Sequence, residues 1–205
     1  MKCTSFLFVL FLGLPLSSAG GQGRWPADEF ARQLVPGKPV PAEPCRAETP
    51  ALTSDSLGPL RPGMTLAELL RACPRPYYGW HIEEGIPEPG IAVRLGRVLA
   101  LVILRDTVGS KAVAYRILIA DSAARTPDGL GPGSRLAEMI AAWGPPRIDA
   151  AECSLYVWFP TRAHLSWIME FPTRWDCSRL ERFVTDSAPS QLPGTLRAGL
   201  AILAQ

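Results

Sequence analysis

The sequence predicts an α+β fold made of two tandem repeats, each a short helical segment packed on an antiparallel β-meander. Residues 62–76 read P-G-M-T-L-A-E-L-L-R-A-C-P-R-P, and residues 132–146 read P-G-S-R-L-A-E-M-I-A-A-W-G-P-P. Both stretches begin with Pro-Gly, end in proline and are followed by strand-like segments. The shared start and stop favour an internal repeat over chance similarity between two amphipathic helices. We therefore expect a first repeat at 57–122 and a second at 123–205.

Each stretch contains the signals of a short helix. Gly63 permits a sharp turn, and Thr65 with Glu68 forms a T-x-x-E capping box. The apolar positions then follow helical spacing and are repeated in the second copy, as Leu66, Leu69, Leu70 and Cys73 and again as Leu136, Met139, Ile140 and Trp143. Prolines end both helices. A helix of about two turns is not stable alone, so each must lie on a sheet.

The sheet residues are predicted from alternation. After the first helix we expect strands at 78–83, 91–95, 98–104 and 111–120, with 85–90 as a loop. The segment 98–104 is apolar throughout, which indicates a strand covered on both faces.

After the second helix, 153–159 and 164–171 alternate and predict a hairpin. Residues 174–178 are expected to be a loop and 180–184 a short strand. The end of the chain, 195–204, is interpreted as the last strand, with a C-terminal helix as the alternative.

The N-terminus has the pattern of a secretory signal peptide. Lys2 precedes an apolar run at 6–16, and small residues then lead to a cleavage site after Ala19. The run is too short for a membrane anchor, since spanning a bilayer takes about 20 apolar residues. We expect a periplasmic or secreted protein with no stable membrane insertion after cleavage. Residues 20–56 are rich in proline and are expected to form an N-terminal arm.

Four cysteines remain after residue 19: Cys45, Cys73, Cys153 and Cys177. An even cysteine count in an exported chain indicates disulfides, and four cysteines allow three pairings. We favour Cys45–Cys73 with Cys153–Cys177, because each bridge then stays within one half of the chain. A metal site would require clustered ligands such as C-x-x-C, which the sequence lacks.

A resemblance to known families extends over about residues 57–204. It is carried by the two turn-helix stretches, G-M-T-L-A-E-L-L and G-S-R-L-A-E-M-I, and by the proline stop and meander that follow each of them. They resemble the helix-on-sheet repeats of BamE/SmpA-type outer-membrane assembly lipoproteins and of the beta-lactamase inhibitor protein family. The connector R-T-P-D-G-L-G-P-G-S at 125–134 is similar to that of uncharacterised bacterial envelope proteins. The resemblance implies a non-catalytic, exported binding or assembly module. The chain departs from the BamE type because no lipobox cysteine follows its apolar run.

The sequence contains no recognisable catalytic, cofactor-binding or metal-binding constellation. The two histidines, His81 and His164, have no partner at metal-ligand spacing. The adjacent Glu83 and Glu84 point to opposite faces of a strand, and the glycine turn at 131–134 lacks the P-loop lysine. A formal net charge of +2 without a basic run argues against nucleic-acid binding.

A candidate partner-binding surface lies on the second hairpin. Alternation leaves Tyr156, Trp158 and His164 on the face away from the core. The expected core face consists of Leu155, Val157, Phe159, Leu165, Trp167, Met169 and Phe171. Arg94 and Arg116 are expected at the corresponding face of the first repeat, giving the surface a basic edge. Aromatic residues in a partly polar setting are typical of interfaces. The alternative is that the other repeat or the arm covers this face.

These observations predict a non-catalytic exported module that binds a protein partner in the cell envelope or extracellular space. The first alternative is a secreted inhibitor of a hydrolase, as in the beta-lactamase inhibitor family. The second is a small-ligand binder or enzyme that uses the space between the repeats.

Overall fold

The computed structural model describes residues 32–83, 85–108, 111–151, 153–171, 177–186 and 192–204. The expected signal peptide at 1–19, and the arm as far as residue 31, lie outside the described residues. The side chains of 106–108, 111, 179, 181, 183, 185 and 186 are likewise outside this description.

The described strands form a single mixed sheet, so the predicted α+β fold of two helix-on-meander repeats is wrong. The sheet has nine strands in the order β1-β3-β4-β5-β9-β8-β7-β6, with β2 paired to β3 on the edge that β1 also uses. The strands are β1 (Pro44–Arg46), β2 (Tyr77–Glu83), β3 (Ile86–Leu95), β4 (Val98–Val108), β5 (Lys111–Ile119), β6 (Arg147–Ala151), β7 (Ser154–Trp158), β8 (Leu165–Glu170) and β9 (Arg197–Ala204).

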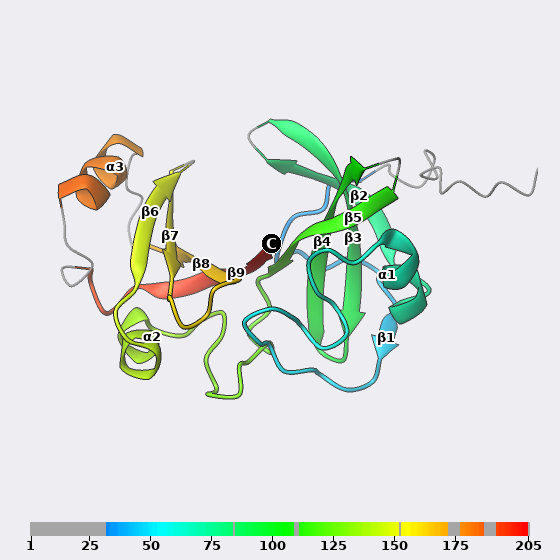
Figure 1. Cartoon of the computed structure of the whole chain (residues 1–205), viewed down its shortest axis with the longest axis horizontal. Helices are drawn as coiled ribbons and strands as arrows, with labels where there is room; N and C mark the ends of the chain where they lie inside the picture. Colours follow the sequence, from blue (N-terminus) through cyan, green and yellow to red (C-terminus); the bar gives the residue numbers. More distant parts are fainter. Residues whose placement is uncertain are drawn as a thin grey trace, which may run out of the picture.

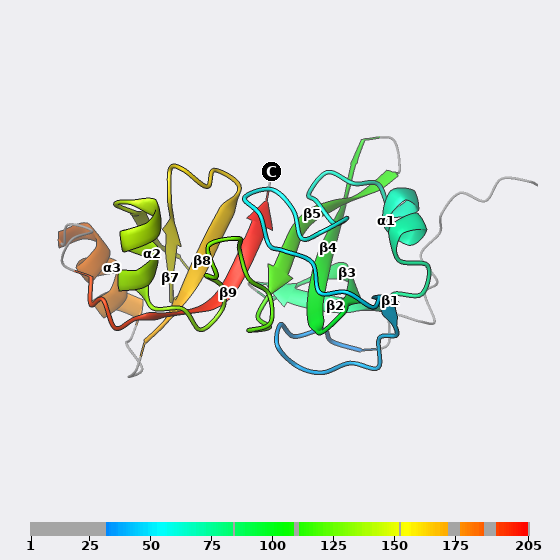
Figure 2. The same ribbon diagram turned by 90° about the horizontal axis from the view of Figure 1, so that it is seen from below.

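One pairing makes the sheet continuous. The last strand, β9, runs antiparallel to β5, with Arg116 opposite Ala204 and Ile119 opposite Ala201. The two strands lie side by side at the centre of the molecule (Figure 2). The two halves of the chain therefore share backbone hydrogen bonds as well as side-chain packing. The result is one β-rich fold with a single sheet.

Three short helices accompany the sheet in the described chain: α1 (Leu66–Ala72), α2 (Leu136–Trp143) and α3 (Cys177–Asp186). α1 lies beside the strands of the first half and α2 beside those of the second (Figure 1). α1 begins with the predicted capping box, since Thr65 Oγ1 accepts from the Glu68 N–H and the Glu68 carboxylate accepts from the Thr65 N–H. In α2 the Glu138 carboxylate accepts from the Arg135 N–H at 2.8 Å.

The two Pro-Gly turns make matching backbone contacts. Gly63 donates to the Ala114 carbonyl of β5 at 2.7 Å, and Gly133 donates to the Ala198 carbonyl of β9 at 2.6 Å. Both glycines have positive φ, 85° and 90°. The repeated sequence therefore places each helix against the last strand of its own half.

The larger hydrophobic core lies on the helix side of the sheet and runs through both halves. Leu69 of α1, Met139 of α2 and Leu180 of α3 belong to the same buried cluster as the strand residues beneath them. A smaller cluster lies on the opposite face and includes Leu101, Leu118 and Ile202. β4 contributes to both clusters, which confirms that 98–104 is covered on both faces.

The described part of the arm is integrated into the fold. Leu34 is buried in the smaller cluster, and its N–H donates to the Trp80 carbonyl of β2 at 2.6 Å. Farther along, β1 pairs in parallel with β3, where Pro44 lies opposite Arg94. The arm thus covers one face of the first half of the sheet.

Three local predictions are wrong. Cys177 and Ser178, expected at the end of a loop at 174–178, are the first residues of α3. Residues 86–90, expected in a loop, are the first residues of β3. The prolines there are tolerated because β3 pairs with β4 only from Gly90 onward, so Pro87 and Pro89 face only β2. Residues 180–184, expected as a strand, belong to α3, where Leu180 and Val184 are four apart and pack on the core together.

Disulfides join Cys45 to Cys73 and Cys153 to Cys177, with Cα–Cα distances of 4.9 and 4.4 Å. These are the pairings that the sequence analysis favoured. Disulfides persist in oxidising compartments, so they fit a secreted or periplasmic protein.

No helix of the described chain is long and apolar enough to cross a membrane.

Candidate functional site

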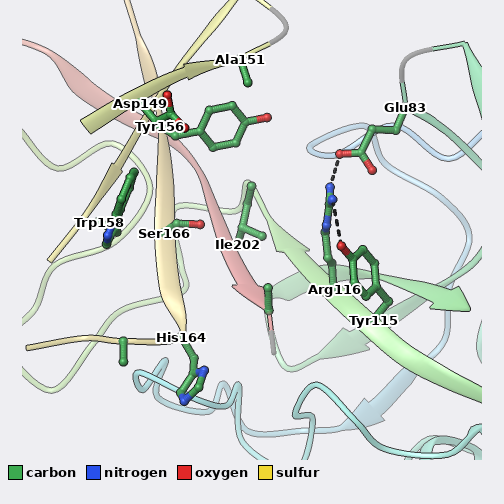
Figure 3. A pocket seen from close by; sticks show the side chains of 12 residues that line it. Glu83, Tyr115, Arg116, Asp149, Ala151, Tyr156, Trp158, His164, Ser166 and Ile202 are labelled. Carbon is green, nitrogen blue, oxygen red and sulfur yellow. Dashed lines mark hydrogen bonds and ion pairs between the residues drawn. The ribbon is translucent and has the colours of Figure 1, made fainter. Parts of the chain in front are cut away.

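A hollow of about 500 Å³ opens on the sheet face opposite the helices, between β6–β9 on one side and β5 with the end of β2 on the other (Figure 3). Its lining residues are Glu83, Tyr115, Arg116, Asp149, Ala151, Tyr156, Trp158, Ala163, His164, Ser166, Ile202 and Ala204.

Strand alternation builds the aromatic wall of the hollow. In β7, Leu155 and Val157 are fully buried on the helix side, which turns Tyr156 and Trp158 to the opposite face. Tyr156 and Trp158 are half-buried, as expected for rings that line an open site. His164, just before β8, is exposed at the lower end of the hollow in Figure 3.

A bulge in β5 brings two neighbouring residues to the opposite wall. Arg116 lies opposite Ile103 of β4, whereas Ala114 lies opposite Leu104, so Tyr115 is the extra residue. In a regular strand Tyr115 and Arg116 would point to opposite faces; a bulge changes that alternation. Both side chains line the hollow as a result.

Arg116 is held by an ion pair and a hydrogen bond. It forms an ion pair with Glu83 of β2, and its Nη2 donates to the Tyr115 hydroxyl at 3.3 Å (Figure 3). The Tyr115 ring also lies beneath Arg105, whose Cζ is 3.7 Å from the ring centroid. Arg105 in turn forms an ion pair with Glu88 at 2.6 Å. Each guanidinium in this group therefore has its own carboxylate.

This setting shifts two pKa values. The hydrogen bond from Arg116 lowers the pKa of the Tyr115 phenol, burial acts in the opposite direction, and the charges of Arg116 and Arg105 lower it further. Burial opposes the charge on Arg116, but Tyr115 and Glu83 outweigh burial and raise the pKa of the guanidinium. Arg116 is a fixed cation whose charge Glu83 already balances.

Four other polar side chains of the hollow, those of Asp149, Trp158, His164 and Ser166, form no ion pair or hydrogen bond with another described side chain. The Asp149 carboxylate accepts a hydrogen bond from the N–H of Ala150 at 2.8 Å, and no side chain among the described residues pairs with it. Within the same part of the chain, no hydrogen bond joins the side chains of Trp158, His164 or Ser166 to another group. These groups line the hollow and are available to a ligand.

The structure brings four of the five predicted binding residues together. Tyr156, Trp158, His164 and Arg116 all line the hollow, whereas Arg94 lies elsewhere. Arg94 donates to the backbone carbonyls of Ala42 and Val40, at 3.1 and 3.4 Å, and so holds the arm against the sheet.

Three residues that shape the site were not predicted from the sequence. Tyr115 reaches the hollow only through the bulge, and Glu83 only because the β2–β3 hairpin projects toward β5. Asp149 was missed because β6, R-I-D-A-A, was not identified as a strand. The sequence of β6 alternates between polar and apolar residues as far as Ala150, and this alternation could have located the carboxylate. In the structure Ile148 and Ala150 are half-buried and Asp149 is exposed.

The described residues contain no group of three or more His, Cys, Asp or Glu side chains placed to hold a metal ion.

No protein-family model and no curated protein matches the sequence. The fold is similar to the crystal structure of the uncharacterized protein yfeY from Escherichia coli, with a TM-score of 0.51 and 15% sequence identity. The similarity covers 77% of this chain and 100% of that chain. At this identity the likeness concerns the fold alone.

Proposed function

We propose that this protein is a non-catalytic exported module that binds a segment of a protein partner in the hollow. The observation that carries the proposal is the convergence of Tyr156, Trp158, His164 and Arg116 in one concave site. Tyrosine, tryptophan and arginine are the residue types that dominate binding energy at protein interfaces. The expected signal peptide and the disulfides support an encounter in the cell envelope or the extracellular space.

The hollow suits a partner segment because two of its walls are already fixed. Tyr156 and Trp158 lie two positions apart on one face of the β7–β8 hairpin, and Arg116 is held by Glu83 and Tyr115. Side chains held before binding lose little conformational entropy on binding. An arriving loop or terminus would meet a preformed receptor.

Site-specific photo-crosslinking tests this proposal. A photoreactive residue at Ser166, inside the hollow, is compared in the producing cell with one at Glu48, an exposed residue at the far end of the sheet. The proposal predicts a discrete protein adduct from position 166 that is lost on Trp158→Ala and is not formed from position 48. An identical adduct pattern from both positions, or none from position 166, would contradict it.

A second candidate function is the binding of a small molecule. The hollow, at about 500 Å³, lies in the size range of small-ligand pockets, and it carries a few polar groups among aromatic rings. In that case position 166 would yield no protein adduct, and native mass spectrometry of the protein purified from its producing cell would show a bound mass that Trp158→Ala removes.

Inhibition of a hydrolase remains the third candidate, and the family resemblance is its support. Inhibition of beta-lactamases or proteases at micromolar concentration, abolished by Trp158→Ala, would favour it over an assembly role.

A further inference from the structure

We propose that the protein forms a symmetric dimer in which β6 of one copy pairs antiparallel with β6 of a second copy. The pairing is centred on Ile148, so that Arg147 of each copy lies opposite Asp149 of the other. The sheet then continues across two molecules. This dimer does not depend on the proposed function, because every residue that lines the hollow belongs to one chain.

The outer edge of β6 carries backbone groups that point away from the rest of the sheet. Among the described strands β6 is the last of its row and pairs with β7 alone. Ala151 lies opposite Ser154 with two residues between them, so this pair exchanges both backbone hydrogen bonds. Bonded pairs then alternate along an antiparallel ladder. The N–H and C=O groups of Ile148 and Ala150 therefore point outward.

The described chain leaves this edge open. The Ala150 N–H donates to Oδ1 of Asp149 at 2.8 Å. The Ala150 carbonyl and both backbone groups of Ile148 have no hydrogen bond to a described residue. α3 lies beside β6 in Figure 1 and packs on its helix side, where Leu180 shares a cluster with Ile148 and Ala150. A strand of a second molecule can therefore supply the missing backbone partners.

The opposite end of the sheet is closed by the chain itself. The Leu34 N–H of the arm donates to the Trp80 carbonyl of β2 at 2.6 Å, and the Trp80 N–H donates to the Arg32 carbonyl at 2.9 Å. β1 has three residues and begins with Pro44, which has no N–H to donate. An open strand edge is a template for pairing with another chain, and the described chain offers such an edge at β6.

The charges of β6 select a second copy of the same strand. Arg147 and Asp149 lie on one face, since they are two positions apart and both are exposed. No ion pair or hydrogen bond joins the Arg147 guanidinium to a described group. With the two Ile148 residues opposite each other, each Arg147 lies across from Asp149 of the second copy. Side chains are closest in such non-hydrogen-bonded pairs, and opposite charges there stabilise the sheet.

Neighbouring symmetric registers fit less well. A register centred on Arg147 or on Asp149 places two like charges directly opposite each other, which destabilises a sheet. A register centred on Ala150 places Asp149 opposite Ala151 of the second copy and leaves the charges unpaired. The pattern R-I-D is thus complementary to itself in the register centred on Ile148, as an interface with two-fold symmetry requires.

The dimer would present two hollows on the same side of the extended sheet. Asp149 lines the hollow in each copy, and side chains that are cross-strand neighbours lie on one face of a sheet. A partner with two binding segments would therefore engage both copies at once, and linked binding events raise the overall affinity.

Sedimentation equilibrium of the chain from residue 20 onward, over a wide range of protein concentration, tests the dimer. Arg147→Asp and Asp149→Arg each bring like charges opposite each other and should weaken self-association by at least about tenfold. The double variant with both changes exchanges the two charges and should return the affinity to within about threefold of the parent. Glu48→Arg reverses an exposed charge at the far end of the sheet and should leave self-association unchanged. Thermal unfolding checks that each variant is folded.

A chain that stays monomeric at every concentration, or a dimer that both single reversals leave unchanged, would overturn the inference. Weakening in the single variants without recovery in the double variant would overturn the register centred on Ile148. A photoreactive residue at Pro145, which is exposed just before β6 and lies opposite Ala151 of the second copy in this register, should give an adduct of twice the chain mass in the producing cell. An adduct with a different protein instead would assign the edge to that protein and contradict the dimer.

Discussion

Arg116 of β5 forms an ion pair with Glu83 of β2 across one wall of the hollow (Figure 3). Both side chains are mostly buried, with 24% and 19% of their surface exposed. The pair connects the β2–β3 hairpin to the central strand of the sheet. It therefore links the stability of the hairpin to the shape of the candidate site.

Replacing Glu83 with Gln should lower the free energy of unfolding by about 1–2 kcal/mol, because a partly buried Arg116 then loses its counter-charge. Urea denaturation measures the change. The matched control is Glu43→Gln, which breaks the exposed Arg75–Glu43 pair, with 80% and 66% of its side-chain surface exposed. That change should cost no more than about 0.5 kcal/mol. Equal losses in the two variants would contradict the assigned role of Glu83.

The pKa of the Tyr115 phenol should lie below the ordinary value for tyrosine. Its pKa is lowered because the phenolate form would be stabilised by the hydrogen bond from Arg116 and by two nearby guanidinium charges. The difference between spectrophotometric titrations of the phenolate band in the parent and in Tyr115→Phe isolates the Tyr115 transition, which should fall below the ordinary value of about 10. Arg116→Gln should raise the pKa of Tyr115 toward the ordinary value of about 10. A Tyr115 transition at or above the ordinary value in the parent would argue against this arrangement.

Gly133 should tolerate Asn better than Ala. Its φ of 90° belongs to the region that L side chains avoid, and an added Cβ would meet no atom within 4 Å, so the cost is conformational alone. Gly133→Ala is expected to lower stability by about 1–2 kcal/mol. Gly133→Asn should lower stability by less than Gly133→Ala does, because asparagine adopts positive φ more readily than alanine. Thermal unfolding of the two variants and the parent measures these differences in stability. A Gly133→Ala variant as stable as the parent would show that the turn does not need a positive φ at this position.

Each disulfide should contribute about 3–4 kcal/mol to the free energy of unfolding. The two bridges join residues that are 28 and 24 positions apart in the sequence. The paired replacements Cys45→Ser with Cys73→Ser, and Cys153→Ser with Cys177→Ser, measure each contribution by denaturation. In the unfolded parent chain from residue 20 onward, thiol titration should detect no free thiol before reduction and four afterwards. Peptide mapping that finds a bridge between the two halves would contradict the pairing.

The sequence was sufficient for features that depend on near neighbours. The capping box of Thr65 and Glu68, the turn at Gly63 and the two faces of β7 follow from residues within a few positions of one another. The alternation that buries Val157 turns Trp158 to the open face. For this reason the face of β7 on which Tyr156 and Trp158 lie could be predicted from the sequence.

Features that depend on distant residues were not predictable in the same way. The pairing of Arg116 with Ala204 joins strands that are far apart in the chain, and no local pattern specifies that β9 returns to β5. The bulge at Tyr115 is defined only against β4. The single sheet replaced the two expected repeats for this reason, and one wall of the hollow was missed.

The most direct measurement of the central claim is the affinity of the partner crosslinked at position 166 for three forms of the protein. Calorimetry with the purified partner would compare the parent, Trp158→Ala in the hollow, and Ile82→Ser on the β2–β3 hairpin, where Ile82 is 45% exposed and does not line the hollow. If the hollow is the binding site, Trp158→Ala should weaken binding by about thirtyfold or more, as expected for a hot-spot residue, and Ile82→Ser by less than about threefold. Unchanged affinity in Trp158→Ala, or a larger loss in Ile82→Ser, would show that the partner binds elsewhere.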